Sequence, residues 1–397
     1  MKIIQLISIK FEMKNIGIIV YGRFPTEKAY GSHIIDIADG FLENNCNVNV
    51  FYSKTSKKKT IDVSPREYYE NKQINFIEVK NYDFTKLFFY NFVPNFIQKI
   101  FWTLGAYYWS KSLKNNLENI DTLWSTNPNL LINHASSNKN IIYEKHGAGK
   151  LIQKYVVKKL SKYENVFFVG TSKTSFEELS DLSPNNTIYL TNGVNLNLYK
   201  NDISREKNKK LNIGYIGMLE TYGKDKGVKK AFQELKNLAK NHDFKLTLIG
   251  GPKEKVDEIT QEFQNTNIDF SYKYKVPKNE VSEYMKELDI GIVPYPNEFH
   301  MTNYASPMKI FEYAAGGAVV LSSDIKSNLE LNETKLGIIY FKADDFDDFR
   351  EKISNLISDT NLRQKLATIL MEKIRLTTAE KRSRYRATAI SSLSVPI

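Results

Sequence analysis

The chain has 397 residues, a formal net charge of +11 and a single cysteine, Cys46. One cysteine excludes an internal disulfide and any metal site built from several cysteines, and it suits a reducing compartment. The length fits two domains of a little under 200 residues each, and 42% of the residues are apolar, enough for two hydrophobic cores.

The sequence contains no stretch that approaches the roughly 20 uninterrupted apolar residues needed to span a bilayer. The apolar run at the start is short and is interrupted by Lys10 and Glu12. A second methionine, Met13, stands directly before the first strand-like segment. We therefore expect residues 1–12 to be an extension or a mis-assigned start. With no spanning segment and one cysteine, we expect the protein in the cytoplasm, either free or peripheral on the cytoplasmic face of the membrane.

The positive charge is concentrated in the first half. Residues 1–200 hold 25 basic and 17 acidic side chains, whereas residues 201–397 hold 31 and 28. A basic half indicates an anionic partner, either a membrane surface or an acidic acceptor. The alternative is a lysine-rich composition that serves only solubility.

In chain order, short β-branched runs alternate with segments of helical period, which is typical of a parallel sheet with crossover helices. The first half predicts strands at 17–21, 48–52, 74–79, 122–125, 140–144, 166–170 and 187–190. It predicts helices at 32–44, 96–116, 151–161 and 173–182.

The alternation then restarts. The second half predicts strands at 211–216, 245–249, 268–272, 290–293 and 318–322, and helices at 228–241, 254–265, 280–288 and 308–315; the tail at 359–389 is predicted to form helices. Two such blocks predict an α/β protein with two doubly wound, Rossmann-like domains. We place these domains at residues 1–195 and 196–375, followed by a C-terminal helix at 376–397. Ligands of such sheets bind at the carboxyl ends of the strands.

The most informative segment is the predicted helix that begins with Ser306 and Pro307, an N-cap and first-turn pair. Its free backbone N–H groups and positive dipole end suit a diphosphate. Two turns later, the Glu312 carboxylate can accept hydrogen bonds from both hydroxyls of a ribose. An ordinary capped amphipathic helix is the alternative interpretation.

This segment resembles the nucleotide-sugar site of the group 1 (family 4) retaining glycosyltransferases, which have the GT-B fold. Members often read Ser-Pro-x-Lys-x-Phe-Glu-Tyr-x-Ala-x-Gly, as residues 306–317 do here. The resemblance implies that Ser306, Pro307, Lys309 and Glu312 bind the donor. Many relatives carry a Glu eight residues before the second Glu, and this chain has Tyr304 there; Glu298 is not at the matching position.

A second segment resembles the family's Gly-Arg-Leu loop and the Lys-Gly start of the next helix. Gly217 and Lys226 match positions that contact the donor diphosphate, and Met218 stands where the family has arginine. Lys224 is a possible substitute for that missing cation. Alone, a Lys-Gly pair would indicate only a solvated helix start. Gly251, in a Gly-Gly-Pro loop at 250–252, is also implied to bind the donor.

The linker at 190–195, with its Asn-Gly-Val run, and the stretch 276–294 match the family in order and spacing. In the first half, the loop after the first strand makes another anion-reaching geometry. We expect Gly31 to approach the donor phosphate, and Thr26, Glu27 and Lys28 to face the acceptor. An ordinary loop between strand and helix is the alternative.

At the end of the strand at 140–144, Glu144 and His146 resemble the family's Glu-x-His, whose histidine points toward the donor sugar. A lone histidine is more often structural, but the end of a strand beside a glycine favours a position in the cleft. We therefore predict His146, Lys226 and Glu312 as catalytic, and Glu144 as an acceptor-side residue. The other four histidines have no comparable context, although the last of them lies in the loop before the helix at 308–315: His33, His134, His242 and His300.

One stretch points to a membrane surface. Residues 86–111 interleave aromatic side chains with lysines, which suits an interfacial segment. The alternative is a core helix of the first domain, because aromatic stripes are usually buried.

The resemblance covers residues 14–390 and implies two facing Rossmann-like domains, with the last helix crossing back to the first. It implies transfer of a sugar from a nucleotide-sugar to a glycan or lipid-linked acceptor, with retention of configuration, in surface polysaccharide or glycoconjugate assembly. No metal or other cofactor and no nucleic acid partner is expected. Two alternatives stay open: a nucleotide-sugar epimerase of the same fold, and a non-catalytic partner subunit of a glycosyltransferase.

Overall fold

A computed structural model describes residues 14–26, 29–53, 61–80, 92–199, 210–221, 223–274, 276, 278–306, 308–331 and 337–390; of these, the side chains of residues 29, 278, 279 and 377–390 are not described. The chain divides into two compact units. The first comprises Met1–Glu144, Lys150–Phe168 and Arg382–Ile397, and the second comprises Lys145–Gly149 and Val169–Lys381.

The first sheet has the strand order β3-β2-β1-β4-β5-β6-β7. Its strands are β1 (Asn15–Val20), β2 (Asn47–Ser53), β3 (Asn75–Val79), β4 (Thr122–Ser125), β5 (Asn140–Lys145), β6 (Val166–Gly170) and β7 (Thr187–Tyr189). The pairs from β3 to β5 are parallel, and β1 is buried along almost its whole length, as expected for a sheet that helices cover on both faces.

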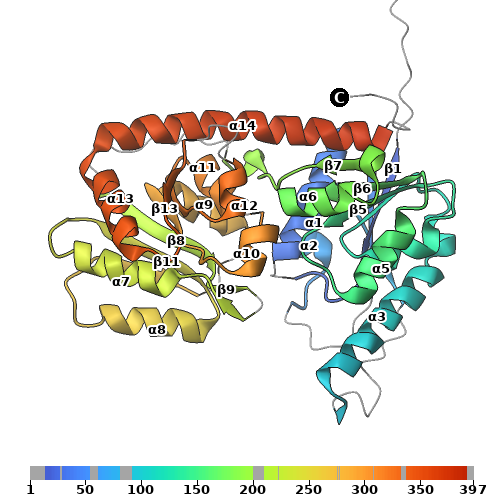
Figure 1. Ribbon diagram of the computed structural model, residues 1–397, viewed down its shortest axis with the longest axis horizontal. Helices are drawn as coiled ribbons and strands as arrows, with labels where there is room; N and C mark the ends of the chain where they lie inside the picture. Colours follow the sequence, from blue (N-terminus) through green and yellow to red (C-terminus); the bar gives the residue numbers. More distant parts are fainter. Residues whose placement is uncertain are drawn as a thin grey trace, which may run out of the picture. The chain divides into compact units, whose positions relative to one another are not determined.

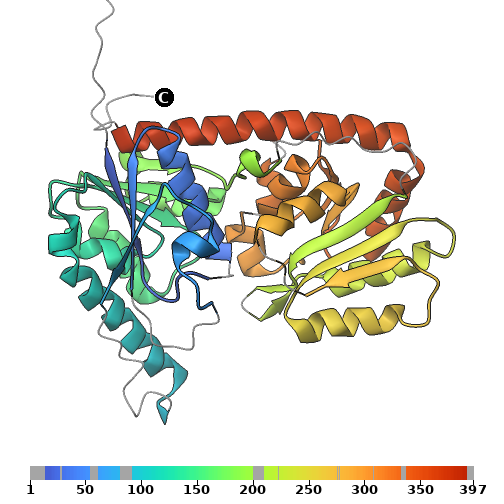
Figure 2. The ribbon, with the colours of Figure 1, turned by 180° about the vertical axis from the view of Figure 1, so that it is seen from behind.

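The helices that follow these strands are α1 (Ala29–Leu42), α2 (Pro65–Tyr68), α3 (Asn95–Ser112), α4 (Pro128–Leu131), α5 (Leu151–Leu160) and α6 (Lys173–Ser180). Figure 1 labels them, and in Figure 2, seen from behind, α1 lies close to the sheet. Helix α4 contacts both α3 and α5, so these three helices form one layer.

The second unit contains a sheet with the order β12-β11-β8-β13-β14-β15. Its strands are β8 (Asn212–Met218), β11 (Lys245–Gly251), β12 (Phe270–Lys273), β13 (Ile290–Val293), β14 (Val319–Ser323) and β15 (Ile339–Phe341). All five pairs of neighbouring strands in this sheet are parallel. In sequence order this is 3-2-1-4-5-6, the doubly wound arrangement of dinucleotide-binding domains.

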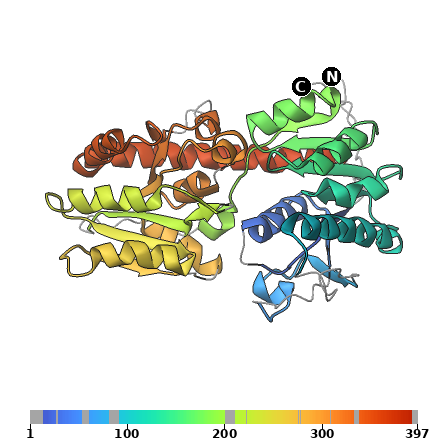
Figure 3. The same cartoon turned by 60° about the horizontal axis from the view of Figure 1, so that its bottom comes forward.

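The remaining helices are α7 (Val228–Leu238), α8 (Lys253–Phe263), α9 (Lys278–Glu287), α10 (Phe299–Tyr304), α11 (Met308–Ala315), α12 (Lys326–Leu329), α13 (Phe346–Ser358) and α14 (Thr360–Ile390). Helices α7 and α8 contact each other, and α9 contacts α11. The two pairs cover opposite faces of the sheet (Figures 1 and 3).

The strands and helices predicted from the sequence are confirmed to within a few residues, and β4, β6, β13 and α11 match their predicted bounds. The predicted helix at 96–116 ends earlier, at Ser112, and a 3-10 turn follows it. A two-stranded hairpin, β9 (Glu220–Thr221) and β10 (Lys224–Asp225), was not predicted, because two-residue strands leave no periodic pattern.

The core of the second unit explains why α11 lies where it does. Tyr313 is fully buried, and its hydroxyl accepts a 2.9 Å hydrogen bond from the Ile216 backbone N–H on β8. Its ring fills the space beside Gly291 on β13, where a Cβ would lie 2.4 Å from the ring. The tyrosine thus fixes α11 against the two central strands, and the glycine makes room for it.

Among the described residues, no helix is long and apolar enough to cross a membrane. The domain boundaries placed at residues 195 and 375 stay a prediction. The expected joint near residues 191–204 lies partly outside the described residues.

Candidate functional site

The candidate site of the second unit lies where its sheet changes direction. Strands β8 and β13 are neighbours in the sheet, but the chain leaves them toward opposite sides. In doubly wound sheets, ligands bind at the carboxyl ends of the strands at this point. Here those ends present Gly217 and Met218 from β8, and Pro294 and Tyr295 after β13.

Two glycines allow the chain to pack tightly at this edge. A Cβ on Gly250 would lie 1.8 Å from the Gly217 carbonyl oxygen, so a side chain there would separate β8 from β11. The predicted donor residue Gly251 is buried, and its carbonyl accepts a 2.8 Å hydrogen bond from the Leu219 N–H. The Gly-Gly pair therefore joins the two strand ends that carry the Gly217 loop.

Lys226 is held at this edge by the glycine that follows it. Gly227 has a φ of +77°, and a Cβ on it would lie 2.2 Å from the Pro294 carbonyl oxygen, so α7 can begin directly against the end of β13. The Lys226 ammonium lies 5.3 Å from the centre of the Tyr295 ring. Burial first, and the charge of Lys309 second, lower the pKa of Lys226 to about 8.

Lys309 and Glu312 lie on the first turns of α11 and pair with each other. The Lys309 Nζ is 2.7 Å from Glu312 Oε2, and both side chains are about one-fifth exposed (20% and 18%). Burial raises the pKa of the Tyr295 hydroxyl, and the negative charge of Glu312 raises it further. Two lysines and one carboxylate thus meet beside Tyr295 and leave one positive charge without a carboxylate partner in the described part of the chain.

The linker that precedes the second sheet holds the start of α11. The Asn192 backbone N–H donates to Ser306 Oγ, and its side-chain amide donates to the Ser306 carbonyl, both at 2.9 Å. Pro307, the next predicted donor residue, lies outside the described residues. Asn192 was not predicted as a site residue; the Asn-Gly-Val run was the signal that could have indicated it.

Met218 and Tyr304, the two departures from the family pattern, lie in different environments. Met218 is 43% exposed. Tyr304 is buried and donates a 2.6 Å hydrogen bond to Glu178 on α6, which also pairs with Lys145. Glu298 accepts hydrogen bonds from the His300 and Met301 N–H groups and so caps α10, in agreement with its exclusion from the acidic pair.

In the first unit, close packing explains why a glycine stands at position 31 and why Thr26 is buried. A Cβ on Gly31 would lie 2.4 Å from the Tyr69 hydroxyl oxygen and 2.8 Å from the Thr26 carbonyl oxygen. Thr26 is 1% exposed, and its Oγ1 accepts a 3.3 Å hydrogen bond from Arg23. Neither residue therefore needs a ligand to explain it, and their roles toward donor and acceptor stay predictions. Glu27 and Lys28 lie outside the described residues.

Glu144 has a buried partner that the sequence did not indicate. Its carboxylate is fully buried and lies 2.6 Å from Nε2 of His33, which is 111 positions earlier on α1. The His33 ring also packs against Trp124 at 6.0 Å between ring centres. This pair joins α1 to the end of β5, which is a structural reason for Glu144. His146 follows in the loop after β5, and its catalytic role stays a prediction.

The family comparison agrees with this geometry. Residues 210–359 match the family model described as glycosyl transferases group 1, a range that contains Gly217, Lys226, Lys309 and Glu312. This segment is therefore similar to the group 1 glycosyltransferases. The enzyme class predicted from the sequence, glycosyltransferase, is thereby confirmed. The search of curated proteins gave no match to the chain.

Solved structures resemble this chain over almost its whole length. HepE from Anabaena, crystallised with UDP, has 15% sequence identity and a TM-score of 0.66, and the match covers 94% of this chain and 98% of HepE. A glycosyltransferase from Rickettsia africae reaches a TM-score of 0.68 at 13% identity, with 96% and 100% covered. Sucrose-phosphate synthase from Thermosynechococcus elongatus reaches 0.64 at 14% identity, with 94% and 98% covered. The predicted GT-B fold is confirmed.

Proposed function

We propose that this protein is a retaining glycosyltransferase that moves a sugar from a nucleotide-sugar to a glycan or lipid-linked acceptor. The observation that carries the proposal is the half-buried Lys226 ammonium, which faces Lys309 and has no carboxylate partner among the described residues. Two lysines and one carboxylate at the ligand-binding edge of a Rossmann-like sheet leave one net positive charge, which an anionic ligand balances. The diphosphate of a nucleotide-sugar supplies it.

The proposed pose of the donor is determined by the groups that bind its diphosphate and by the carboxylate that binds its ribose. The diphosphate lies between Lys226 and the N-terminus of α11, where backbone N–H groups and the helix dipole favour negative charge. Glu312 then accepts hydrogen bonds from the ribose hydroxyls through the oxygen that Lys309 does not occupy. HepE and its complex with UDP-glucose support a nucleotide-sugar as the donor class.

The proposed reaction keeps the configuration at the anomeric carbon. The acceptor hydroxyl attacks on the face that the diphosphate leaves, the bond from the anomeric carbon to the phosphate oxygen breaks, and the departing phosphate takes the hydroxyl proton. No side-chain base is then needed. Catalysis consists of positioning and of stabilising the charge that grows on the diphosphate, which is the task assigned to Lys226 and Lys309.

We also propose that the enzyme works in the cytoplasm on the surface of an anionic membrane, as surface polysaccharide or glycoconjugate assembly on a lipid carrier requires. Helix α3 exposes a group of large apolar side chains: Phe96, Ile100, Trp102, Leu104, Tyr107 and Tyr108. Helix α5, in the same layer, exposes Leu151, Ile152 and Tyr155.

The charges on these helices favour a membrane as the partner. The sequences of α3 and α5 contain no Asp or Glu, and they carry lysines at 99, 111, 154, 158 and 159. Apolar and aromatic side chains next to lysines, without acids, suit the headgroup region of an anionic bilayer. Residues 86–91, the first part of the stretch predicted to lie at a membrane surface, are outside the described residues.

A panel of nucleotides and nucleotide-sugars, screened for thermal stabilisation, tests the donor proposal. A cognate nucleotide should raise Tm in proportion to its affinity, because it binds the folded protein only. A Tm that no nucleotide changes would contradict the proposal. A nucleotide that binds without transfer to any acceptor would indicate the partner subunit, for which the exposed Met218 and the Tyr304–Glu178 bond are the structural arguments.

A further inference from the structure

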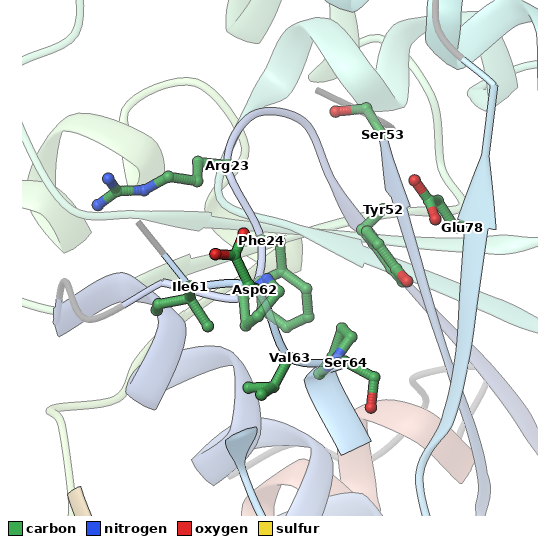
Figure 4. A pocket seen from close by; sticks show the side chains of 11 residues that line it. Arg23, Phe24, Tyr52, Ser53, Ile61, Asp62, Val63, Ser64 and Glu78 are labelled. Atoms are coloured by element: carbon green, nitrogen blue, oxygen red, sulfur yellow. The ribbon is translucent and has the colours of Figure 1, made fainter. Parts of the chain in front are cut away.

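A pocket in the first unit has no role in the donor site. It has a volume of about 250 Å³ and opens at the carboxyl ends of three neighbouring strands, β1, β2 and β3. Figure 4 shows its lining. Because ligands of open parallel sheets bind at this end of the strands, the position alone makes the pocket a candidate binding site.

The walls of the pocket combine apolar surface with polar groups at the edges. Phe24 is buried and packs against the half-buried Tyr52 ring, with 5.5 Å between ring centres. The polar groups are Arg23, Asp62 and Glu78. In Figure 4, Tyr52 and Glu78 lie on one side of the pocket and Arg23 on the other, with Asp62 and Phe24 between them.

Several polar groups of the pocket lack protein partners. The Asp62 and Glu78 side chains are exposed at the rim of the pocket, and in the described ranges of the chain neither carboxylate takes part in an ion pair; the half-buried Tyr52 hydroxyl makes no hydrogen bond there. Burial, and then the charge of Glu78, raise the pKa of Tyr52, so its hydroxyl stays protonated and can donate. The two carboxylates thus offer acceptors to a ligand, and the Tyr52 hydroxyl and the Arg23 guanidinium at the opposite side offer donors.

These groups select a ligand class. Carboxylates only accept hydrogen bonds, so the ligand must carry several donors. Charges of both signs line the pocket, so a fully anionic or cationic ligand would meet a like charge. The aromatic wall requires an apolar face on the ligand. A neutral pyranose ring meets all three conditions, because it has hydroxyls around its edge and C–H groups on its faces.

We propose that this pocket binds one neutral sugar ring of the acceptor, stacked on Tyr52 with its hydroxyls bonded to Glu78 and Asp62. The volume supports a single ring, because it lies below the roughly 300–1,000 Å³ of sites for drug-sized ligands. The inference rests on the proposed transferase function. It places acceptor recognition at residues 23–25, 52–53, 61–65 and 78 rather than at Thr26 to Lys28.

Saturation-transfer NMR on the full-length protein tests the proposal, with methyl glycosides of glucose, galactose and mannose as probes. At least one should receive magnetisation from the protein. Tyr52→Ala should abolish this transfer, because it removes the stacking face, and Glu78→Gln should weaken binding about tenfold by removing a charge-assisted hydrogen bond. Glu67→Gln is the matched control, because Glu67 is exposed on the neighbouring helix α2 and does not line the pocket.

The inference would be overturned if both pocket variants gave the glycoside signal unchanged, or if no neutral glycoside received magnetisation from the protein. A preference for methyl glucuronide or methyl glucosaminide over the neutral glycosides would also overturn it. Tyr52→Phe keeps the ring, so it separates loss of the stacking face from misfolding, and it should retain the signal. Glu312→Ala should leave the glycoside signal intact. If sugars bind but no nucleotide does, the proposed function fails and the pocket stands. If the enzyme transfers sugar from a nucleotide-sugar but Glu78→Gln does not change the KM for the acceptor, the proposed function stands and the pocket assignment fails.

Discussion

Gly217 and Lys309 share one small space at the end of β8. A Cβ on Gly217 would lie 2.6 Å from Cε of Lys309, so the lysine side chain runs across the face of the glycine. Lys309 reaches its partner Glu312 from there. The glycine in the Gly-Met-Leu loop therefore serves the lysine on α11, 92 positions later.

We predict that Gly217→Ala weakens nucleotide binding about tenfold or more, because the new methyl group displaces Lys309 from the diphosphate site. Isothermal titration with the cognate nucleotide measures this. Gly217 has a φ of +155°, so backbone strain of about 1–3 kcal/mol also accompanies the change. Gly223→Ala is the control, because Gly223 has a φ of +75° and no atom within 4 Å of its Cβ position. Equal effects of both variants on affinity would contradict the prediction.

Glu312 and Lys309 should act on different parts of the donor. Glu312→Ala should weaken both the nucleotide and its nucleoside, because the ribose loses charge-assisted hydrogen bonds worth about 1.5–3 kcal/mol each. Lys309→Met should weaken the nucleotide and leave the nucleoside nearly unchanged, because the nucleoside has no phosphate. The dissociation constants of the two ligands for the two variants check this. A nucleoside affinity that Glu312→Ala does not change would remove Glu312 from the ribose site.

The sequence predicted the donor half of the site well, because its parts are local. A helix start, a Gly-Gly break and a Lys-Gly pair each follow from neighbouring residues, and α11 has its predicted bounds. What it could not predict are partners far apart in the chain. The Tyr304 hydroxyl bonds to Glu178, 126 positions earlier, and Glu144 to His33, 111 positions earlier. No local pattern encodes such pairs.

The pocket in the first unit was missed for the same reason. Its lining comes from three strand ends and the segment 61–65, and none of these alone forms a motif. The prediction for Thr26, Glu27 and Lys28 relied on the loop after the first strand, because that loop resembled the family. Close packing of Gly31 against Thr26 shows that a glycine in such a loop has a steric explanation as well as a phosphate-binding one.

Membrane attachment should depend on α3 and α5. The protein should pellet with vesicles that contain anionic phospholipid at low ionic strength and be released as salt is added, because the lysines are screened within a Debye length of about 10 Å at 0.1 M. Replacement of Lys154, Lys158 and Lys159 by Gln should reduce binding about a hundredfold, at about 1 kcal/mol for each lysine. Gln at the exposed Lys230 and Lys240 of the second unit is the control. Equal binding to neutral and anionic vesicles would exclude this surface.

Turnover should survive complete removal of divalent metal ions. Lys226, Lys309 and the N-terminus of α11 already offer positive charge to the diphosphate, so a cation is not needed to neutralise it. Initial rates with the cognate donor, measured after dialysis against EDTA and again with added magnesium or manganese, check this. Activity that EDTA abolishes and either metal restores would contradict the proposed mechanism.

The last prediction concerns Lys226, whose pKa is lowered to about 8 by burial and by Lys309. Because the folded-state pKa lies below the ordinary 10.5 of lysine, the charged form costs free energy in the unliganded protein, fully below pH 8 and not at all above about 10.5. Lys226→Met should therefore raise the Tm of the unliganded protein at pH 7. A bound diphosphate favours the ammonium, so nucleotide binding should take up a proton between about pH 8 and 10 and weaken as pH rises through that window.

The same variant should lower kcat about a hundredfold or more and change KM much less, because the ammonium acts most strongly on charge that develops as the diphosphate leaves. Titration calorimetry in buffers of different ionisation enthalpy measures the proton uptake, which Lys226→Met should abolish. Lys224→Ala is the matched control, because Lys224 is exposed on β10 and only two positions away. If Lys224→Ala reduces kcat and Lys226→Met does not, the leaving group is stabilised from the hairpin, and the assignment of Lys226 is wrong.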